Sequence, residues 1–275
     1  MNQHSTYTSN RDLKAQIFAL NNRAVDHLRQ QEPYHAVALL RVALEMAQAE
    51  LSKCVASQGP EQQQQGLRSN HALAPECSSG SPNPASRVAQ VSVATTRAVD
   101  IQRSLMPESG MNLISFYERA FRLEAPEDVL GPEEEVSPVT EQYDAVFAII
   151  IYNIGMAHCL TASTTMHQSS QAFGMALNMF QLALSIVTKT TGPFERHHRL
   201  VLLALLNNIG YLHSQFVRVR ELTQCLAFMN DVLNNFMSVR VVGQEGGARD
   251  DELRFFLDQT LQENPNELVI AAPMA

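Results

Sequence analysis

Apolar residues recur along much of the chain at intervals of three and four positions, the spacing that places them on one face of a helix. Before Pro33 these positions are Ile17, Leu20, Ala24 and Leu28, and the spacing resumes after the proline. Because proline interrupts a helix, the pattern predicts two helices joined by a turn at the RQQEP sequence. Residues 1–54 are therefore expected to form an antiparallel helical hairpin.

The same spacing returns in residues 143–240, where it predicts four helices, and thus two further hairpins. Their expected ranges are 144–160, 168–188, 194–216 and 220–239. Residues 241–275 are expected to supply a capping helix and a flexible tail. Its apolar residues Leu253, Phe256, Leu257 and Leu261 would cover the end of the helical stack.

The middle of the chain has a different pattern. Residues 55–90 are rich in Gln, Ser, Pro and Gly, a composition typical of a disordered linker. Residues 91–124 contain β-branched and aromatic stretches, which predict a β-hairpin or an extended arm. Residues 125–142 read as an acidic linker. The expected fold is all-α, built from antiparallel helical hairpins, with a disordered and partly extended insertion.

One short motif occurs three times within the helical regions. "YNIGMAH" (Tyr152 to His158) and "NNIGYLH" (Asn207 to His213) share Asn, a small residue and His at the same spacing, and "NNRAVDH" (Asn21 to His27) is a less regular copy. Each copy lies late in the first helix of a predicted hairpin. The second helix then carries small and large apolar residues in alternation, as in Ala36, Leu40 and Ala43.

This arrangement resembles the tetratricopeptide repeat (TPR), a helical hairpin with a small residue in its first helix and Ala, a large residue and a small residue in its second. Ala24 and Ala36 are twelve residues apart, as in a standard repeat, whereas Gly155 and Ala176 are 21 apart. The longer spacing implies longer helices or a longer turn. In the third copy, larger residues (Leu222, Leu226 and Met229) replace the small ones. The resemblance implies an α-solenoid of stacked hairpins.

Helix geometry divides the motif into two faces. Gly155 and His158 are three residues apart and share a face, whereas Asn153 points roughly the opposite way. The resemblance implies that Asn22, Asn153 and Asn208 line a groove, where an amide can both donate to and accept from the backbone of an extended peptide. The alternative is that these asparagines tie adjacent helices together. The flanking groove residues would be Asn21, Arg29, Tyr152, Met156, Asn207, Tyr211 and Gln215.

Composition and charge narrow the classes of function. The net charge is −8 and only three residues are lysine, so nucleic-acid binding is not expected. Four scattered cysteines favour a reducing compartment. The polar N-terminus does not read as a secretory signal, and the apolar run 145–160 is shorter than a membrane span and predicts a buried helix. We expect an intracellular protein, cytoplasmic or nuclear, that is not secreted and binds no membrane.

No familiar catalytic or metal-binding motif is present in the sequence. We therefore expect a non-catalytic interaction scaffold, without cofactor or metal, that binds a peptide or protein segment in a TPR-like groove. Two alternatives stay open. The first is a metal-dependent or other helical enzyme that uses His158, His213 and Cys159, and the second is a structural subunit of a larger complex.

Overall fold

The computed structural model describes residues 3–57, 95–101, 114–124, 139–164, 169–189, 196–240 and 250–261. Most of the linker expected at 55–90, most of the acidic linker expected at 125–142 and the C-terminal tail lie outside these residues. Two expected boundaries are wrong by a few residues. The second helix continues to Ser57, and the helix after the acidic linker already begins at Val139, so both helices extend into the predicted linkers.

The described residues are mostly helical. The helices are α1 (Gln3–Arg29), α2 (Pro33–Ser57), α4 (Val139–Thr164), α5 (Ser169–Val187), α6 (Arg196–Gln215), α7 (Val219–Arg240) and α8 (Asp250–Leu261). They pack as three successive pairs, α1 with α2, α4 with α5, and α6 with α7. Helix α2 also packs on α4, and α5 on α6. The first hairpin therefore joins the other two in one body, although residues 58–138 separate it from them in sequence.

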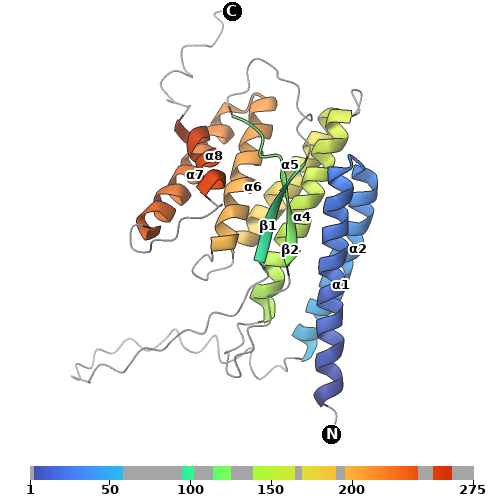
Figure 1. Ribbon diagram of the computed structural model, residues 1–275. Helices are drawn as coiled ribbons and strands as arrows, with labels where there is room; N and C mark the ends of the chain where they lie inside the picture. The colour runs from blue at the N-terminus through green and yellow to red at the C-terminus, as the bar shows by residue number, and fades with distance from the viewer. Residues whose placement is uncertain are drawn as a thin grey trace, which may run out of the picture.

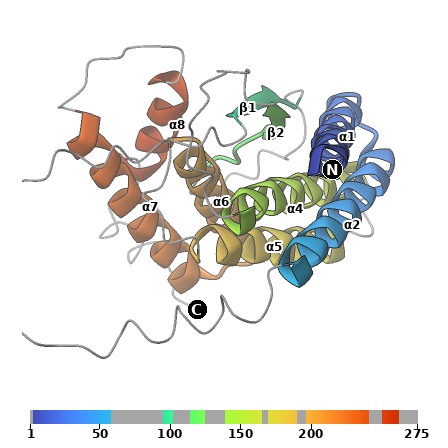
Figure 2. The ribbon, with the colours of Figure 1, turned by 90° about the horizontal axis from the view of Figure 1, so that it is seen from below.

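Together the helices form an open arc, with α1 and α2 at one end and α7 and α8 at the other (Figures 1 and 2). Two strands, β1 (Thr95–Asp100) and β2 (Arg119–Glu124), lie on the inner side of this arc (Figure 2). They pair antiparallel, with Thr95 opposite Glu124 and Asp100 opposite Arg119. A two-stranded sheet is therefore present within residues 91–124, where the sequence left a β-hairpin or an extended arm open. Strand β2 packs against α1 and α4.

The turns that end α1 and α6 have the same geometry. Gln31 has a φ of 61° and Val217 a φ of 56°, which places both in the left-handed region that glycine normally fills. After α1, the amide of Glu32 donates to the carbonyl of His27 (2.9 Å). After α6, the amide of Arg218 donates to the carbonyl of His213 (2.9 Å). The first and third copies of the motif therefore end in the same type of turn.

The second hairpin differs from the first in how far its helices extend from the motif toward the connecting turn. Helix α4 continues for nine residues after Gly155, and α5 begins seven residues before Ala176. In the first hairpin the corresponding stretches are five and three residues. On the side that faces the turn, each helix thus extends about one turn further, which explains most of the 21-residue spacing. Of the two explanations that the sequence allowed, longer helical stretches next to the turn are the main one.

Small residues allow the paired helices to approach closely. Ala24, Ala36 and Ala43 are fully buried in the first hairpin. In the second, a Cβ added to Gly155 would lie 2.6 Å from the ring of Phe180 on α5. Phe180 therefore occupies space that any side chain at position 155 would need. This contact gives the glycine of the motif a packing role, as its helix face predicted.

Two helices, α4 over Tyr143–Thr164 and α5, are long and apolar enough to cross a membrane by length and composition. In this fold 89% of the apolar window of α4 is buried. Its neighbours are α2, α5 and strand β2. The apolar character of α4 is therefore accounted for by the protein core, in agreement with the buried helix expected at 145–160.

Candidate functional site

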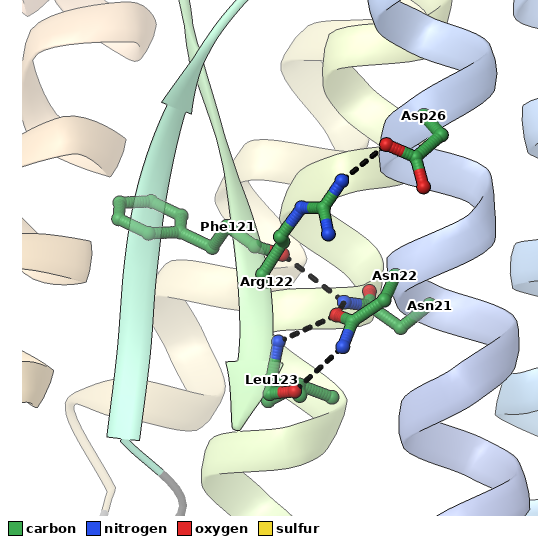
Figure 3. Close-up of polar contacts among 6 residues, drawn as sticks. All are labelled: Asn21, Asn22, Asp26, Phe121, Arg122 and Leu123. Atoms are coloured by element: carbon green, nitrogen blue, oxygen red, sulfur yellow. Dashed lines mark hydrogen bonds and ion pairs between the residues drawn. The ribbon is translucent and has the colours of Figure 1, made fainter.

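The inner side of the arc carries the three asparagines of the motif, and they bind a segment of the same chain. We call Asn22, Asn153 and Asn208 the amide ladder, and residues 115–123 the docked segment. From α1, Nδ2 of Asn22 donates to the Leu123 carbonyl (2.8 Å), while its Oδ1 accepts from the Leu123 amide (2.8 Å) (Figure 3). One side-chain amide thus satisfies both backbone groups of one residue.

The other two asparagines repeat this pairing. Asn153 of α4 donates to the carbonyl of Phe121 (2.8 Å) and accepts from its amide (3.0 Å). Asn208 of α6 donates to the carbonyl of Tyr117 (3.2 Å) and accepts from its amide (2.9 Å). Within the docked segment, the amide ladder therefore bonds main-chain groups only, and these contacts do not depend on which side chains the segment carries.

The docked segment runs in the opposite direction to the order of the helices. Its partners Leu123, Phe121 and Tyr117 are met in turn by α1, α4 and α6. Successive residues of an extended chain point their backbone groups to opposite edges, so the ladder meets only odd-numbered residues. The other edge faces β1, where the amide of Ile101 donates to the carbonyl of Glu118 (2.9 Å). The asparagine side chains thus take the place of a neighbouring strand.

Other amides extend the ladder at its α6 end and reinforce it at Phe121. Asn207 donates to the Ser115 carbonyl (2.9 Å), and Oε1 of Gln259 on α8 accepts from the Ser115 amide (2.6 Å). Asn21 donates to the Phe121 carbonyl (3.1 Å), which therefore accepts two bonds. Apart from the half-buried Asn22, these amides are buried, where a missing partner costs the most.

Tyr152 joins the ladder to the core. Its hydroxyl donates to the Arg119 carbonyl (2.9 Å) and accepts from Nδ2 of Asn208 (3.1 Å). Its ring lies 5.0 Å from that of Phe121 and 5.3 Å from that of Phe180, between centroids. Burial raises the pKa of the Tyr152 hydroxyl well above its usual value, so the group stays a neutral donor.

Buried aromatic and aliphatic side chains also hold the docked segment in place. Phe121, Leu123 and Tyr117 are each at most 3% exposed. The Tyr117 ring lies 4.9 Å from that of Phe256 on α8, between centroids. Helix α8 therefore covers the segment itself, which refines the expectation that it would cap the helical stack.

Charged groups fasten the segment at its exposed side. The guanidinium of Arg122 pairs with the carboxylate of Asp26 on α1, beside Asn22 (Figure 3). Arg119 Nε lies 2.7 Å from Asp100 Oδ1, which links β2 to β1. Both pairs are partly exposed to water, so each adds less stability than the buried amide contacts.

The flanking residues expected for the groove fall into two groups. The docked segment is contacted by Asn21, Tyr152, Asn207 and Tyr211, whose ring lies 5.2 Å from that of Phe116 between centroids. Met156 is buried behind the ladder, with its sulfur 3.5 Å from Nδ2 of Asn208. Arg29 is exposed at the end of α1, and Gln215 is half-buried at the end of α6.

The asparagines also tie helices together, which was the alternative interpretation. Nδ2 of Asn153 donates to Oδ1 of Asn21 (2.9 Å), which connects α4 to α1. Nδ2 of Asn208 meets the hydroxyl of Tyr152, which connects α6 to α4. Each amide serves both purposes, so the two interpretations of the motif are compatible.

The histidines of the motif do not share one environment. His213 is buried and His158 is half-buried, and desolvation lowers the pKa of both imidazoles. The charge of Arg41 on α2 also acts on His158, whereas the charges of Arg218 and Glu221, at the α6–α7 turn and on α7, act on His213. They therefore lie in separate surroundings.

The third member of the alternative site, Cys159, is a poor candidate for a nucleophile. It is buried, and desolvation raises the pKa of its thiol far above the ordinary value. A reactive cysteine needs the opposite shift, because the thiolate is the nucleophile. Within the described residues, His158, His213 and Cys159 are not brought together as a set of three metal-ligand atoms.

Sequence reasoning missed two features. One is the docked segment, whose pairing with the ladder spans 32 to 101 residues of sequence. The other is a cluster of His27, Glu32 and His35 at the α1–α2 turn, whose ligand atoms all lie within 4.8 Å of one another. The spacing of the cluster across a predicted turn was visible in the sequence.

Three comparisons with known proteins complete the description of the site. A scan against protein-family models, a search of curated proteins and a search of solved structures each returned no match.

Proposed function

We propose that the chain is a non-catalytic interaction scaffold, an α-solenoid of TPR-like hairpins, that binds an extended peptide segment across α1, α4 and α6. The observation that carries the proposal is the pairing of Asn22, Asn153 and Asn208 with both backbone groups of one residue each. The shared turn geometry after His27 and His213 supports the repeated unit.

The chain's own docked segment defines the chemistry of a partner. Burying each of Tyr117, Phe121 and Leu123 contributes about 1.5–3 kcal/mol, so a competing segment needs comparable anchors. Counted from the position equivalent to Tyr117, it would carry aromatic residues at the first and fifth positions and an aliphatic residue at the seventh. It would also lie extended, because the ladder bonds only alternate residues.

Tethering makes the docked segment a strong competitor. Because the docked segment belongs to the same chain as the ladder, its effective concentration there is on the order of millimolar. A partner with equal contacts would therefore stay unbound at micromolar concentration, so the site is closed until the segment is weakened or a better ligand arrives.

A peptide supplied in trans tests the proposal. A fluorescent peptide of residues 114–124 is titrated, by anisotropy, against the unaltered chain, against Phe121→Ala, and against Phe121→Ala combined with Asn153→Ala. Phe121→Ala weakens the docked segment without touching the ladder, so we expect at least tenfold tighter peptide binding than to the unaltered chain. The double variant is expected to lose most of that gain.

A scrambled peptide of the same composition serves as the control for non-specific binding. Equal binding of both peptides, or equal binding to the single and double variants, would contradict the groove. The same holds if the weakened chain stays folded, by circular dichroism, and binds no peptide. The ladder would then serve only to hold the chain's own segment and to tie α1, α4 and α6 together.

A further inference from the structure

A second site lies at the turn between α1 and α2, outside the docked segment. His27 is in the last turn of α1, Glu32 precedes the first residue of α2, and His35 follows in the first turn of that helix. Nδ1 of His27 is 2.7 Å from Oε2 of Glu32, and Nδ1 of His35 is 3.5 Å from the same oxygen. Within the described residues, no other group of three potential metal ligands lies this close together.

The backbone of the turn brings these side chains together. The amide of Glu32 donates to the carbonyl of His27 (2.9 Å), and the amide of Ala36 donates to the carbonyl of Glu32 (3.2 Å). Gln31 takes the left-handed conformation, which reverses the chain within a few residues. The ligand atoms are therefore presented by the fixed ends of two helices, and only short side-chain movements are needed to adjust them.

From this geometry we propose that His27, Glu32 and His35 bind one divalent transition-metal ion of the zinc class. Zinc takes imidazole nitrogen at about 2.0–2.1 Å and carboxylate oxygen at about 2.0–2.2 Å, which places neighbouring ligand atoms roughly 3.3 Å apart in a tetrahedral site. The two distances to Glu32 lie on either side of this value. Calcium and magnesium prefer all-oxygen sites, so two nitrogens among three ligands select against them.

The cluster has room for a metal ion and for water. Nδ1 of His27 and Oε2 of Glu32 lie 2.7 Å apart, and the ion would replace the hydrogen bond between them. The side chain of His35 is 74% exposed and that of Glu32 44%, so water can complete the coordination.

Binding at this turn would couple the metal to the amide ladder. Asp26, which pairs with Arg122 of the docked segment, is the neighbour of His27 in sequence. An ion that joins α1 to α2 would restrain the end of α1 on which Asn22 and Asp26 lie. We expect bound zinc to raise the melting temperature of the whole chain, because it binds only the folded turn.

Calorimetric titration of the tag-free, metal-stripped full chain with zinc chloride tests the site. We expect one saturable site per chain, abolished by His35→Ala and weakened at least tenfold by Glu32→Gln. His35 is mostly exposed, so its substitution leaves the fold intact. His158→Gln, in a different part of the fold, and Gln31→Gly, which keeps all three ligands, are the matched controls and are expected to bind normally.

Imidazole NMR gives a second measurement. If the three residues had only a structural role in the turn, zinc would not change their ring nitrogen shifts. Zinc on Nδ1 places the remaining proton of His27 and His35 on Nε2, so their ring nitrogen shifts should change together at one equivalent of metal. The proposal is overturned if the chain shows no saturable zinc site. It is also overturned if zinc binds equally to the unaltered chain, His35→Ala and Glu32→Gln, since the metal would then be held elsewhere.

Discussion

Asn22 of α1 and Asn153 of α4 make the same two hydrogen bonds to the docked segment in very different surroundings. Asn22 is half-buried and lies beside the partly exposed pair of Asp26 and Arg122. Asn153 is fully buried and gives a third bond to Asn21. The comparison teaches that a repeated motif can keep its geometry while the cost of losing it changes, because that cost depends on whether water can replace the lost partner.

The largest effect is expected from Asn153→Ala. The change leaves the amide and carbonyl of Phe121 and Oδ1 of Asn21 without their bonds to Asn153 in a buried place. Since each unsatisfied buried group costs about 1–3 kcal/mol and Asn21 still bonds one of them, we expect a loss of about 3 kcal/mol. Urea unfolding measures it, and a loss under about 1 kcal/mol would show that the site admits water.

Gly155→Ala should rank next. The added Cβ would lie 2.6 Å from the Phe180 ring, so the ring or the helix must move, at a cost of about 1–3 kcal/mol. The matched variant is Gly210→Ala, whose nearest neighbour is the end of the Ile114 side chain at 3.2 Å. We expect it to cost clearly less in thermal unfolding. Equal losses would mean that Phe180 does not set the spacing of α4 and α5.

Asn22→Ala should have a smaller effect than Asn153→Ala. Asn22 itself is half-buried, so water can replace its bonds to Leu123 once the side chain is gone, and we expect a loss of about 1 kcal/mol in urea unfolding. Hydrogen exchange of the Leu123 amide should speed up more than that of Phe121. If the two substitutions destabilise the chain equally, burial does not explain the contrast between α1 and α4.

The smallest effect, and a stabilising one, is expected from Val217→Gly. Val217 is 82% exposed and has a φ of 56°, a conformation that disfavours a β-branched residue. Glycine relieves this strain but loses more entropy on folding, so we expect a net gain of about 0.5–1 kcal/mol in thermal unfolding. Val219→Gly, at the first residue of α7, removes a valine from an ordinary helical position and is the control, which should not stabilise the chain.

Local patterns predicted the helices and the faces of the motif because both depend on residues a few positions apart. The spacing of three and four located the helices of residues 143–240 to within about five residues. The angle of about 200° around the helix between Asn153 and Gly155 separated the asparagine that binds the docked segment from the glycine that packs against α5. The docked segment escaped prediction because its bonds join side-chain amides to backbone groups up to 101 residues away. Bonds of this kind produce no repeating pattern of residues from which the sequence could predict them.

The metal-ligand cluster was missed for a different reason. Its geometry depends on Gln31 adopting a left-handed turn that sequence rules assign to glycine or asparagine. The sequence placed His27 and His35 on two helices joined by a turn, but it did not show that the turn brings their ring nitrogens and the Glu32 carboxylate together.

The reversed direction of the docked segment has a consequence for synthesis on the ribosome. Asn22 has already been made when Leu123 emerges, but Asn153 appears 32 residues after Phe121, and Asn208 appears 91 residues after Tyr117. Gln259, the partner of Ser115, appears last. Because domains begin to fold during synthesis, the segment is expected to bind its partners in order from its last residue back to its first, against the direction of translation.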